Sequence, residues 1–178
     1  KEAIKAHELI KEKIPDALLI LAPRKPERFH AVSKILDQSE LSYCKWSENR
    51  DKNIDSDVLL VDTLGYLLFF YSVGDISFVG GSLFDIGGHN LIEPALMMKP
   101  VLTGPKLDNV LEIADQFRSN QAIIIVSDYK ELSSSILELS KDKERRELMT
   151  NNAMQIIEKN KGSKDKILQL IRPLINLH

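Results

Sequence analysis

Short uninterrupted runs of apolar residues alternate with amphipathic stretches along most of this 178-residue chain. The clearest runs are ALLILAP (17–23), DVLLVDT (57–63) and QAIIIVSD (121–128), and others lie at 41–46, 75–81 and 99–105. Continuous apolar runs are typical of strands that are buried on both faces, as in a parallel sheet covered by helices on each side. The alternation therefore predicts an α/β domain with a doubly wound parallel sheet.

The segments between these runs have the spacing of amphipathic helices. Helices are expected at 1–14, 27–40, 65–73 and 109–120, directly after Gly88, and from Tyr129 to the end with a break at Gly162. Because 43% of the residues are hydrophobic and no linker interrupts the pattern, residues 1–178 are interpreted as a single domain. A net charge of −2 argues against a nucleic-acid partner, and a single cysteine, Cys44, excludes an internal disulfide.

Three loops that follow expected strands carry the informative polar residues, at 23–28, 62–66 and 80–93. Such loops meet at the carboxyl edge of the sheet, where ligands of doubly wound domains bind at a topological switch point. In the first loop, Arg24 lies between Pro23 and Pro26, and a guanidinium on a stiff loop suits bidentate binding of phosphate. A solvated basic loop is the alternative interpretation.

The third loop concentrates glycine in a chain that has only eight glycines. Gly80-Gly81-Ser82 follows a strand directly, and Gly87-Gly88 precedes an expected helix. Glycines let main-chain N–H groups approach an oxyanion closely, and a helix N-terminus adds further donors, so the arrangement suits a phosphate. The pattern matches neither a Walker loop nor the dinucleotide fingerprint. Glycines that only form turns with positive φ remain the alternative.

Asn90 and Glu93 share one face of the helix expected after this loop. A carboxylate there could accept two hydrogen bonds from a vicinal diol such as a ribose. The same spacing also fits a capping box, in which Asn90 is the N-cap and Glu93 reaches back. Pro94 would then fall at the fourth helical position, where it removes a backbone hydrogen bond. The residues alone slightly favour the cap.

The remaining candidates do not form a reaction centre. His89 has no second ligand at metal-binding spacing, so no metal site is predicted. No Ser-His-Asp or Cys-His arrangement and no acid–base pair of carboxylates stands out. The sequence predicts a binding site without catalytic residues of its own.

The segments APRKPERF, VDTLGYL and FVGGSLFDIGGHNLIEPALMMKPVLTGP, in this order and spacing, resemble the C-terminal half of bacterial 3-deoxy-D-manno-octulosonic acid (Kdo) transferases. The resemblance extends over nearly the whole chain, and GGSL followed by GGHNLIEP is its most specific part. It implies the Rossmann-like C-terminal half of a GT-B glycosyltransferase, which binds CMP-Kdo and transfers Kdo to a lipid A precursor in lipopolysaccharide biosynthesis. The reaction implied is inverting and needs no metal or cofactor.

The resemblance also implies roles for individual residues. By matching position, Asn90 and Glu93 would hold the ribose, which reverses the preference for a cap. Pro23 and Arg24 would contact the nucleotide. The phosphate would be surrounded by Gly80, Gly81, Ser82, Gly87 and Gly88, and the nucleotide-binding set is completed by Gly65 and His89. Two positions depart from the family: Lys25 stands where members often have His, and Tyr66 where they often have Glu, which leaves the role of the second loop open.

In the family, a membrane anchor and an N-terminal domain with the catalytic base and the lipid acceptor surface precede this region. The chain, which begins at Lys1 inside an expected helix, is therefore expected to be a soluble part of a protein at the cytoplasmic face of the inner membrane, and inactive alone. In GT-B proteins the last helix, here roughly 163–178, commonly crosses to the other domain. Alone, it would then expose an apolar stripe of Ile167, Leu170, Ile171 and Leu174.

Two rival functions stay open at this point. The chain could be the donor-binding domain of another GT-B transferase or epimerase that uses a UDP-sugar. It could also be a non-catalytic module that binds a nucleotide sugar.

Overall fold

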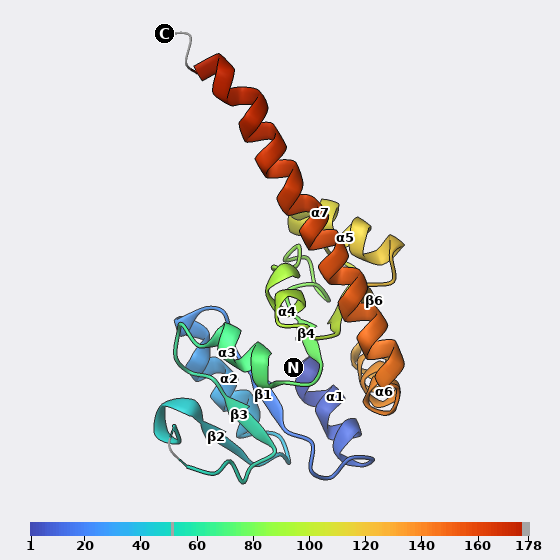
Figure 1. The fold of residues 1–178 in the computed structure, drawn as a ribbon. Helices are drawn as coiled ribbons and strands as arrows, with labels where there is room; N and C mark the ends of the chain where they lie inside the picture. The colour runs from blue at the N-terminus through green and yellow to red at the C-terminus, as the bar shows by residue number, and fades with distance from the viewer. Residues whose placement is uncertain (51, 176–178) are drawn as a thin grey trace.

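The computed structural model of the chain describes residues 1–50 and 52–175, with side chains as far as residue 160. The strands are β1 (Leu19–Leu21), β2 (Tyr43–Lys45), β3 (Val58–Leu60), β4 (Ser77–Val79), β5 (Val101–Thr103) and β6 (Ile123–Ile125). The helices are α1 (Glu2–Lys11), α2 (Phe29–Leu36), α3 (Leu67–Val73), α4 (Ile92–Leu96), α5 (Leu111–Ser119), α6 (Tyr129–Lys141) and α7 (Lys143–Ile175). Three 3-10 turns are η1 (Pro26–Arg28), η2 (Trp46–Glu48) and η3 (Asp108–Val110). The elements alternate along the chain in the predicted order (Figure 1).

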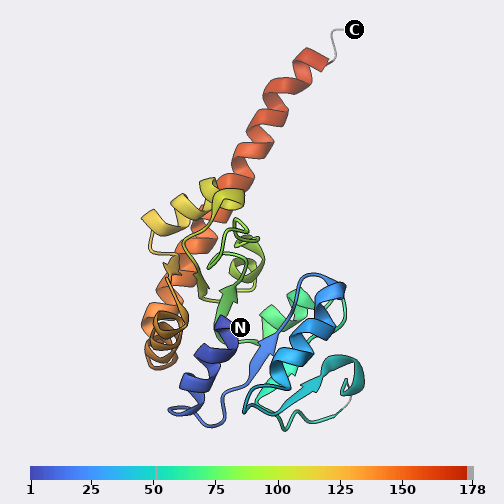
Figure 2. The same cartoon turned by 180° about the vertical axis from the view of Figure 1, so that it is seen from behind.

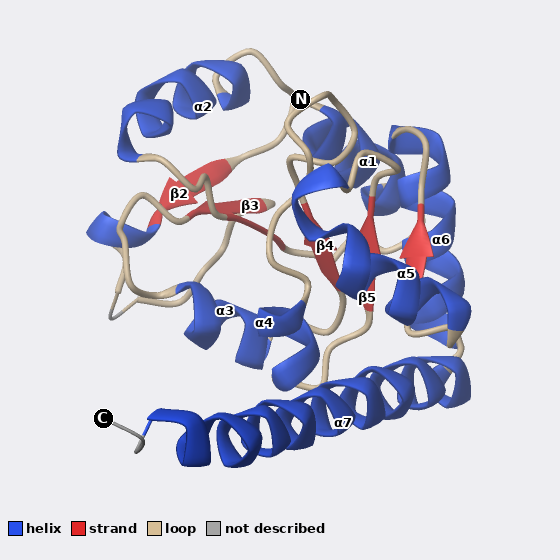
Figure 3. Ribbon diagram, turned by 90° about the horizontal axis from the view of Figure 1, so that it is seen from above, coloured by secondary structure: helices blue, strands red, loops and turns tan. Residues whose placement is uncertain are grey.

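All of the described strand pairs are parallel, which confirms the predicted fold class. The ladders form two three-stranded sheets, ordered β1-β3-β2 and β4-β5-β6. Figure 3 shows the strands in the middle of the molecule, with α1 and α2 on one side and α3, α4 and α7 on the other. The central strands β3 and β5 are buried at every residue because each has a neighbour on both edges and helices on both faces.

Helix α1 packs into the cores of both sheets. Its Ile4 belongs to a cluster with Leu36 of α2 and Val58 of β3, whereas its Ala6 packs with Leu102 of β5 and with residues of α6. Both clusters are apolar and almost fully buried, so α1 joins the two halves of the fold through the hydrophobic effect.

A polar contact anchors α1 at the opposite edge of the sheet from the predicted site. His7 is buried and donates from Nε2 to the Asp57 carbonyl oxygen at 2.9 Å. Lys11 and the hydroxyl and main-chain N–H of Ser42 contact the Asp57 carboxylate, and these contacts lower the pKa of Asp57 to about 2. The cluster satisfies the polar groups where β3 begins.

The helical C-terminal region breaks at Asp142, so the predicted break at Gly162 is wrong. Asp142 ends α6 and also accepts a hydrogen bond from the Arg145 main-chain N–H at 2.9 Å, which caps the start of α7. Helix α7 continues through Gly162 to Ile175. A single glycine costs a helix only about 1 kcal/mol, and therefore it does not end a helix by itself.

The first part of α7 packs against α4, α5 and α6, and the rest extends away from the other elements (Figures 1 and 2). The apolar stripe predicted at Ile167, Leu170, Ile171 and Leu174 lies outside the residues whose side chains are described, and the end of the predicted 163–178 helix beyond Ile175 is also not described. Among the described residues, no helix is both long enough and apolar enough to cross a membrane.

Candidate functional site

Two of the three predicted loops meet in the structure. Arg24, in the loop after β1, lies 3.1 Å from His89, in the loop after β4, measured from Nη1 to Nδ1. The two residues are separated by 65 positions in the sequence, and β1 and β4 belong to different sheets. The contact therefore forms at the carboxyl edges of the two sheets, where the connectivity changes from one sheet to the other.

The glycines explain how His89 reaches this position. Gly81 and Gly88 have φ angles of 73° and 76°, and the Gly88 N–H donates to the Gly81 carbonyl at 2.8 Å. A Cβ on Gly81 would lie 2.7 Å from Nε2 of His89. The missing side chain thus leaves room for the imidazole, and the loop closes on itself through glycines that tolerate positive φ.

The surroundings of His89 favour the neutral form of its imidazole. Burial, and second the charge of Arg24, lower the pKa of His89 below its ordinary value. A guanidinium can only donate, so Nδ1 of His89 is the acceptor and the ring proton resides on Nε2. The pair presents a positive charge and a ring N–H at the same edge of the fold.

Replacing Arg24 with glutamine should raise the pKa of His89 toward its ordinary value, because the second of the two lowering causes is removed while the burial remains. The pKa can be followed by NMR through the histidine ring signals during a pH titration. Lys25→Gln is the matched control, because it removes the same charge from the next residue in the loop. The Lys25 side chain pairs only loosely with Glu27, at 4.0 Å, and its loss should leave the titration of His89 unchanged. Equal titration of His89 in the two variants would contradict this assignment.

Asn90 and Glu93 are hydrogen-bonded to each other, but they do not form the capping box. The Asn90 side chain accepts from the Ile92 N–H at 2.9 Å and donates to Oε1 of Glu93 at 3.1 Å. The helix expected directly after Gly88 begins only at Ile92, and its formal N-cap is Leu91 without a side-chain cap. Pro94 is then the third helical residue, where its missing N–H removes no hydrogen bond, and this explains the later start.

Glu93 is half-buried, and its helix α4 packs against α3. Burial, followed by the charge of Glu93, raises the pKa of Tyr71 in α3 to about 12. Asn90 therefore fixes one carboxylate oxygen of Glu93, and a neutral phenol lies near the same group.

The other predicted residues have varied surroundings. Ser82 is fully buried; its hydroxyl donates to the Val79 carbonyl at 2.9 Å and accepts from the Gly104 N–H at 2.7 Å, so the hydroxyl joins two strand ends. A Cβ on Gly80 would enter open space, and Pro23 is half-buried beside the exposed Arg24. Gly87, with a φ of 88°, lies against Asn109.

Gly65 is not brought to the cavity that Arg24 and His89 line. In its loop, Tyr66 packs edge-on against Trp46 with ring centroids 5.8 Å apart, and the Arg50 guanidinium lies 5.3 Å from the Tyr66 ring. The aromatic ring of Tyr66 thus ties the second loop to the turn that follows β2.

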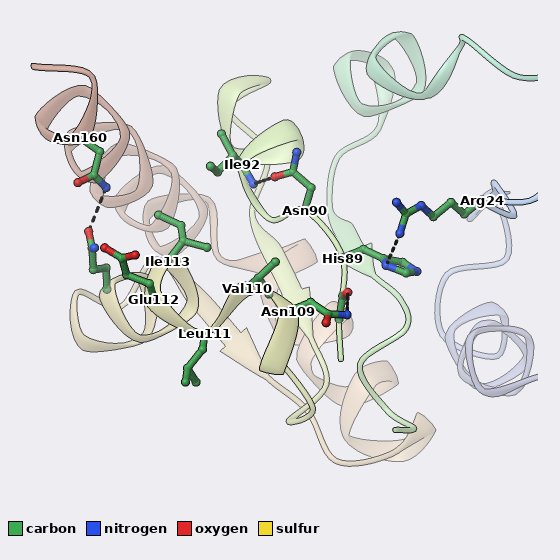
Figure 4. A pocket seen from close by; sticks show the side chains of 12 residues that line it. Arg24, His89, Asn90, Ile92, Asn109, Val110, Leu111, Glu112, Ile113 and Asn160 are labelled. Atoms are coloured by element: carbon green, nitrogen blue, oxygen red, sulfur yellow. Dashed lines mark hydrogen bonds between the residues drawn. The ribbon is translucent and has the colours of Figure 1, made fainter. Parts of the chain in front are cut away.

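A cavity of about 700 Å³ lies beside the Arg24–His89 pair. Of the predicted residues, it is lined by Arg24, Gly88, His89 and Asn90. Figure 4 shows Arg24 and His89 at one end and Glu112 and Asn160 at the other, where Asn160 donates to Oε1 of Gln116 at 3.1 Å. Across the described residues, no cluster of His, Cys, Asp and Glu has the arrangement of a metal site.

Sequence reasoning missed the opposite wall of the cavity, which consists of Asn109, Val110, Leu111, Glu112, Ile113, Gln116 and Asn160. Most of these residues belong to η3 and α5, which follow β5. The rule that selected the other loops also applies here, because β5 is parallel and its loop lies at the same edge of the sheet. Nothing in the sequence marked Asn160 as a site residue, because it belongs to α7, which does not follow a strand.

Sequence comparison finds relatives of this chain among bacterial glycosyltransferases. No family model matches the sequence. The 3-deoxy-D-manno-octulosonic acid transferase of Haemophilus influenzae is 34% identical over 173 residues, which cover 97% of this chain and 40% of the relative. A bifunctional glycosyltransferase/methyltransferase of Fusobacterium nucleatum is 33% identical over 134 residues, or 74% of this chain and 21% of the relative.

A solved structure matches the fold as well as the sequence. The crystal structure of the C-terminal CMP-Kdo binding domain of WaaA from Acinetobacter baumannii superposes with a TM-score of 0.82 at 28% identity, covering 88% of this chain and 81% of that one. The fold and the loops at the carboxyl edge thus define the Rossmann-like C-terminal domain of a GT-B glycosyltransferase. More specifically, the chain is a homologue of the C-terminal domain of the bacterial Kdo transferases, which confirms the resemblance seen in the sequence. It spans 40% of the length of the Haemophilus relative.

Proposed function

We propose that this chain binds CMP-Kdo and forms the donor-binding part of a glycosyltransferase that moves Kdo to a lipid A precursor. The observation that carries the proposal is the meeting of Arg24, His89 and Asn90 at one cavity, on loops that follow β1 and β4. A guanidinium, a ring N–H and a loop of glycines supply cationic and neutral donors, as a sugar nucleotide with a phosphate requires. The related Acinetobacter domain, described as CMP-Kdo binding, supports the choice of nucleotide.

Individual side chains contribute in different ways to the proposed site. Arg24 can pair with the phosphate, because among the described side chains it contacts the ring of His89 and no carboxylate. The Asn90 amide donates to Oε1 of Glu93, and the other carboxylate oxygen of Glu93 remains to accept hydrogen bonds from the ribose hydroxyls. His89 keeps Nε2–H as a donor at the edge of Gly81. Gly80, with open space beside it, allows the main chain to approach the ligand.

Catalysis needs groups that this chain does not contribute to the cavity. Among the described residues that line the cavity, Glu112 is the one carboxylate, and it has no second carboxylate with which to make an acid–base pair. We therefore assign the catalytic base and the surface for the lipid acceptor to a partner domain of the full-length protein at the cytoplasmic face of the inner membrane. The reaction is inverting and independent of a metal, and this chain alone transfers no sugar.

Titration with nucleotides tests the proposed donor. CMP should bind about fivefold or more tightly than UMP, because a hydrogen bond that reads the cytosine amino group contributes about 1 kcal/mol. UMP is the matched control, since it differs from CMP only in the base, and UDP tests the second phosphate of the rival donors. Each dissociation constant can be measured by isothermal titration calorimetry or from NMR chemical-shift changes during the titration.

Tighter binding of UMP or UDP than of CMP would instead indicate a GT-B protein that uses a UDP-sugar. No binding of any of the three at millimolar concentration would contradict a nucleotide site on this chain. A transfer assay on the chain alone completes the test, because product formed from CMP-Kdo would refute the need for a second domain.

A further inference from the structure

The loop after β5 is hydrogen-bonded along its length to the glycine loop. We call residues 80–88 the glycine loop and residues 104–110 the β5 loop. The Lys106 N–H donates to the Ser82 carbonyl at 2.9 Å, and the Gly104 N–H donates to the Ser82 hydroxyl at 2.7 Å. Lys106 also pairs with Asp85 at 3.0 Å. The conformation of the glycine loop thus depends on a second loop that lies more than a dozen residues further along the chain.

Asn109 makes the contacts nearest to the cavity. Its main-chain N–H donates to the Gly87 carbonyl at 2.9 Å. Its side-chain amide donates to the Ile86 carbonyl at 2.8 Å and, more weakly, toward the Gly88 carbonyl at 3.5 Å. One residue therefore contacts the main chain of three consecutive positions immediately before His89.

The packing of the two glycines matches these hydrogen bonds. A Cβ on Gly87 would lie 2.5 Å from Nδ2 of Asn109, and a Cβ on Gly88 would lie 3.0 Å from a methyl carbon of Leu107. The β5 loop fills the space that side chains at these positions would need. Gly87 and Gly88 also have φ angles of 88° and 76°, so the turn is one that other residues rarely adopt.

We propose that Asn109 is a positioning residue of the donor site, which holds the Gly87–Gly88 turn in the conformation that presents His89 and Asn90 to the cavity. This role rests on the proposed function, because its consequence is tight binding of the nucleotide. An amide is required because the side chain must donate to main-chain carbonyls. Alanine has no donor, and aspartate would place a negative oxygen beside the carbonyl oxygens.

The experiment compares Asn109→Ala and Asn109→Asp with a matched control, Asn120→Ala. Asn120 also donates from Nδ2 to a main-chain carbonyl, that of Gln116 at 2.8 Å, but it lies at the other end of α5. In the ligand-free chain, the NMR signals of the Gly87 and Gly88 amides and the pKa of His89 should change in Asn109→Ala and stay unchanged in Asn120→Ala. The dissociation constant for CMP should rise about tenfold in both Asn109 variants, equivalent to the loss of one well-placed hydrogen bond.

The titrations are run well below the unfolding temperature of every variant, so that a loss of stability alone leaves the dissociation constant unchanged. An Asn109→Ala chain that binds CMP as tightly as Asn120→Ala would overturn the positioning role and leave the proposed function intact. Unchanged Gly87, Gly88 and His89 signals would also overturn it. If the parent chain binds no CMP, the proposed function fails, and the positioning role fails with it.

Discussion

Replacing Glu93 with alanine should weaken binding of CMP by about 10- to 100-fold, because a carboxylate that accepts hydrogen bonds from two ribose hydroxyls contributes about 1.5–3 kcal/mol. Glu93 is suited to this role because Asn90 fixes one of its oxygens at 3.1 Å and its side chain is half-buried. A carboxylate that is already oriented loses less conformational entropy when the ligand binds.

Two further variants show whether the effect belongs to the carboxylate. Glu93→Gln keeps the size of the side chain and one acceptor oxygen, so its affinity should fall between those of the parent and Glu93→Ala. Glu158→Ala removes the same charge from an exposed position on α7 and should bind CMP like the parent chain. Calorimetric dissociation constants that are equal for Glu93→Ala and the parent would refute the assignment of the ribose to Glu93.

Replacing Gly104 with alanine should destabilise the fold by about 3 kcal/mol, which lowers Tm by about 6–12 °C in a chain of this size. A Cβ at this position would lie 2.4 Å from the carbonyl carbon and oxygen of Ser82 and 2.6 Å from the main-chain nitrogen of Leu83. All three atoms belong to the backbone, which cannot rotate away as a side chain can. The β5 loop and the glycine loop would have to separate at a fully buried contact.

Gly80→Ala is the matched control for this substitution. Gly80 lies in the same glycine loop, but a Cβ there meets no atom within 4 Å, and its φ is not positive. Thermal unfolding followed by circular dichroism should therefore show a change within about 0.5 kcal/mol for Gly80→Ala. Similar unfolding temperatures for the two variants would mean that the loops are not in tight contact in solution.

The order of the elements and their parallel pairing could be predicted because they depend on local patterns. The apolar runs at 57–63 and 99–105 contain the central strands β3 and β5, whose residues are all buried. The boundaries were less predictable, since the end of a helix depends on which side chains are free to cap it. Asp142 caps α7, whereas Gly162 lies inside it, and composition alone does not distinguish these two outcomes.

Part of the candidate site followed from the same local reasoning. The rule that ligands bind at the carboxyl ends of parallel strands selected the loops of Arg24 and His89, and the structure brings these two residues to 3.1 Å. The rule could not predict that Gly81 makes room for the imidazole, or that Asn109 holds the Gly87–Gly88 turn. Both are contacts between distant segments, and nothing in the spacing of the sequence encodes their distances.

The sequence by itself therefore determined the class of fold and the edge of the sheets at which the site forms, because hydrophobic periodicity and chain direction are properties of each segment. It also carried the resemblance to the Kdo transferases, in the glycines and in Asn90, Ile92 and Glu93. Only the tertiary structure decided which residues face one another across the cavity. The position of the β5 loop is set by the packing of β5 beside β4, and this packing places Asn109 against the glycine loop.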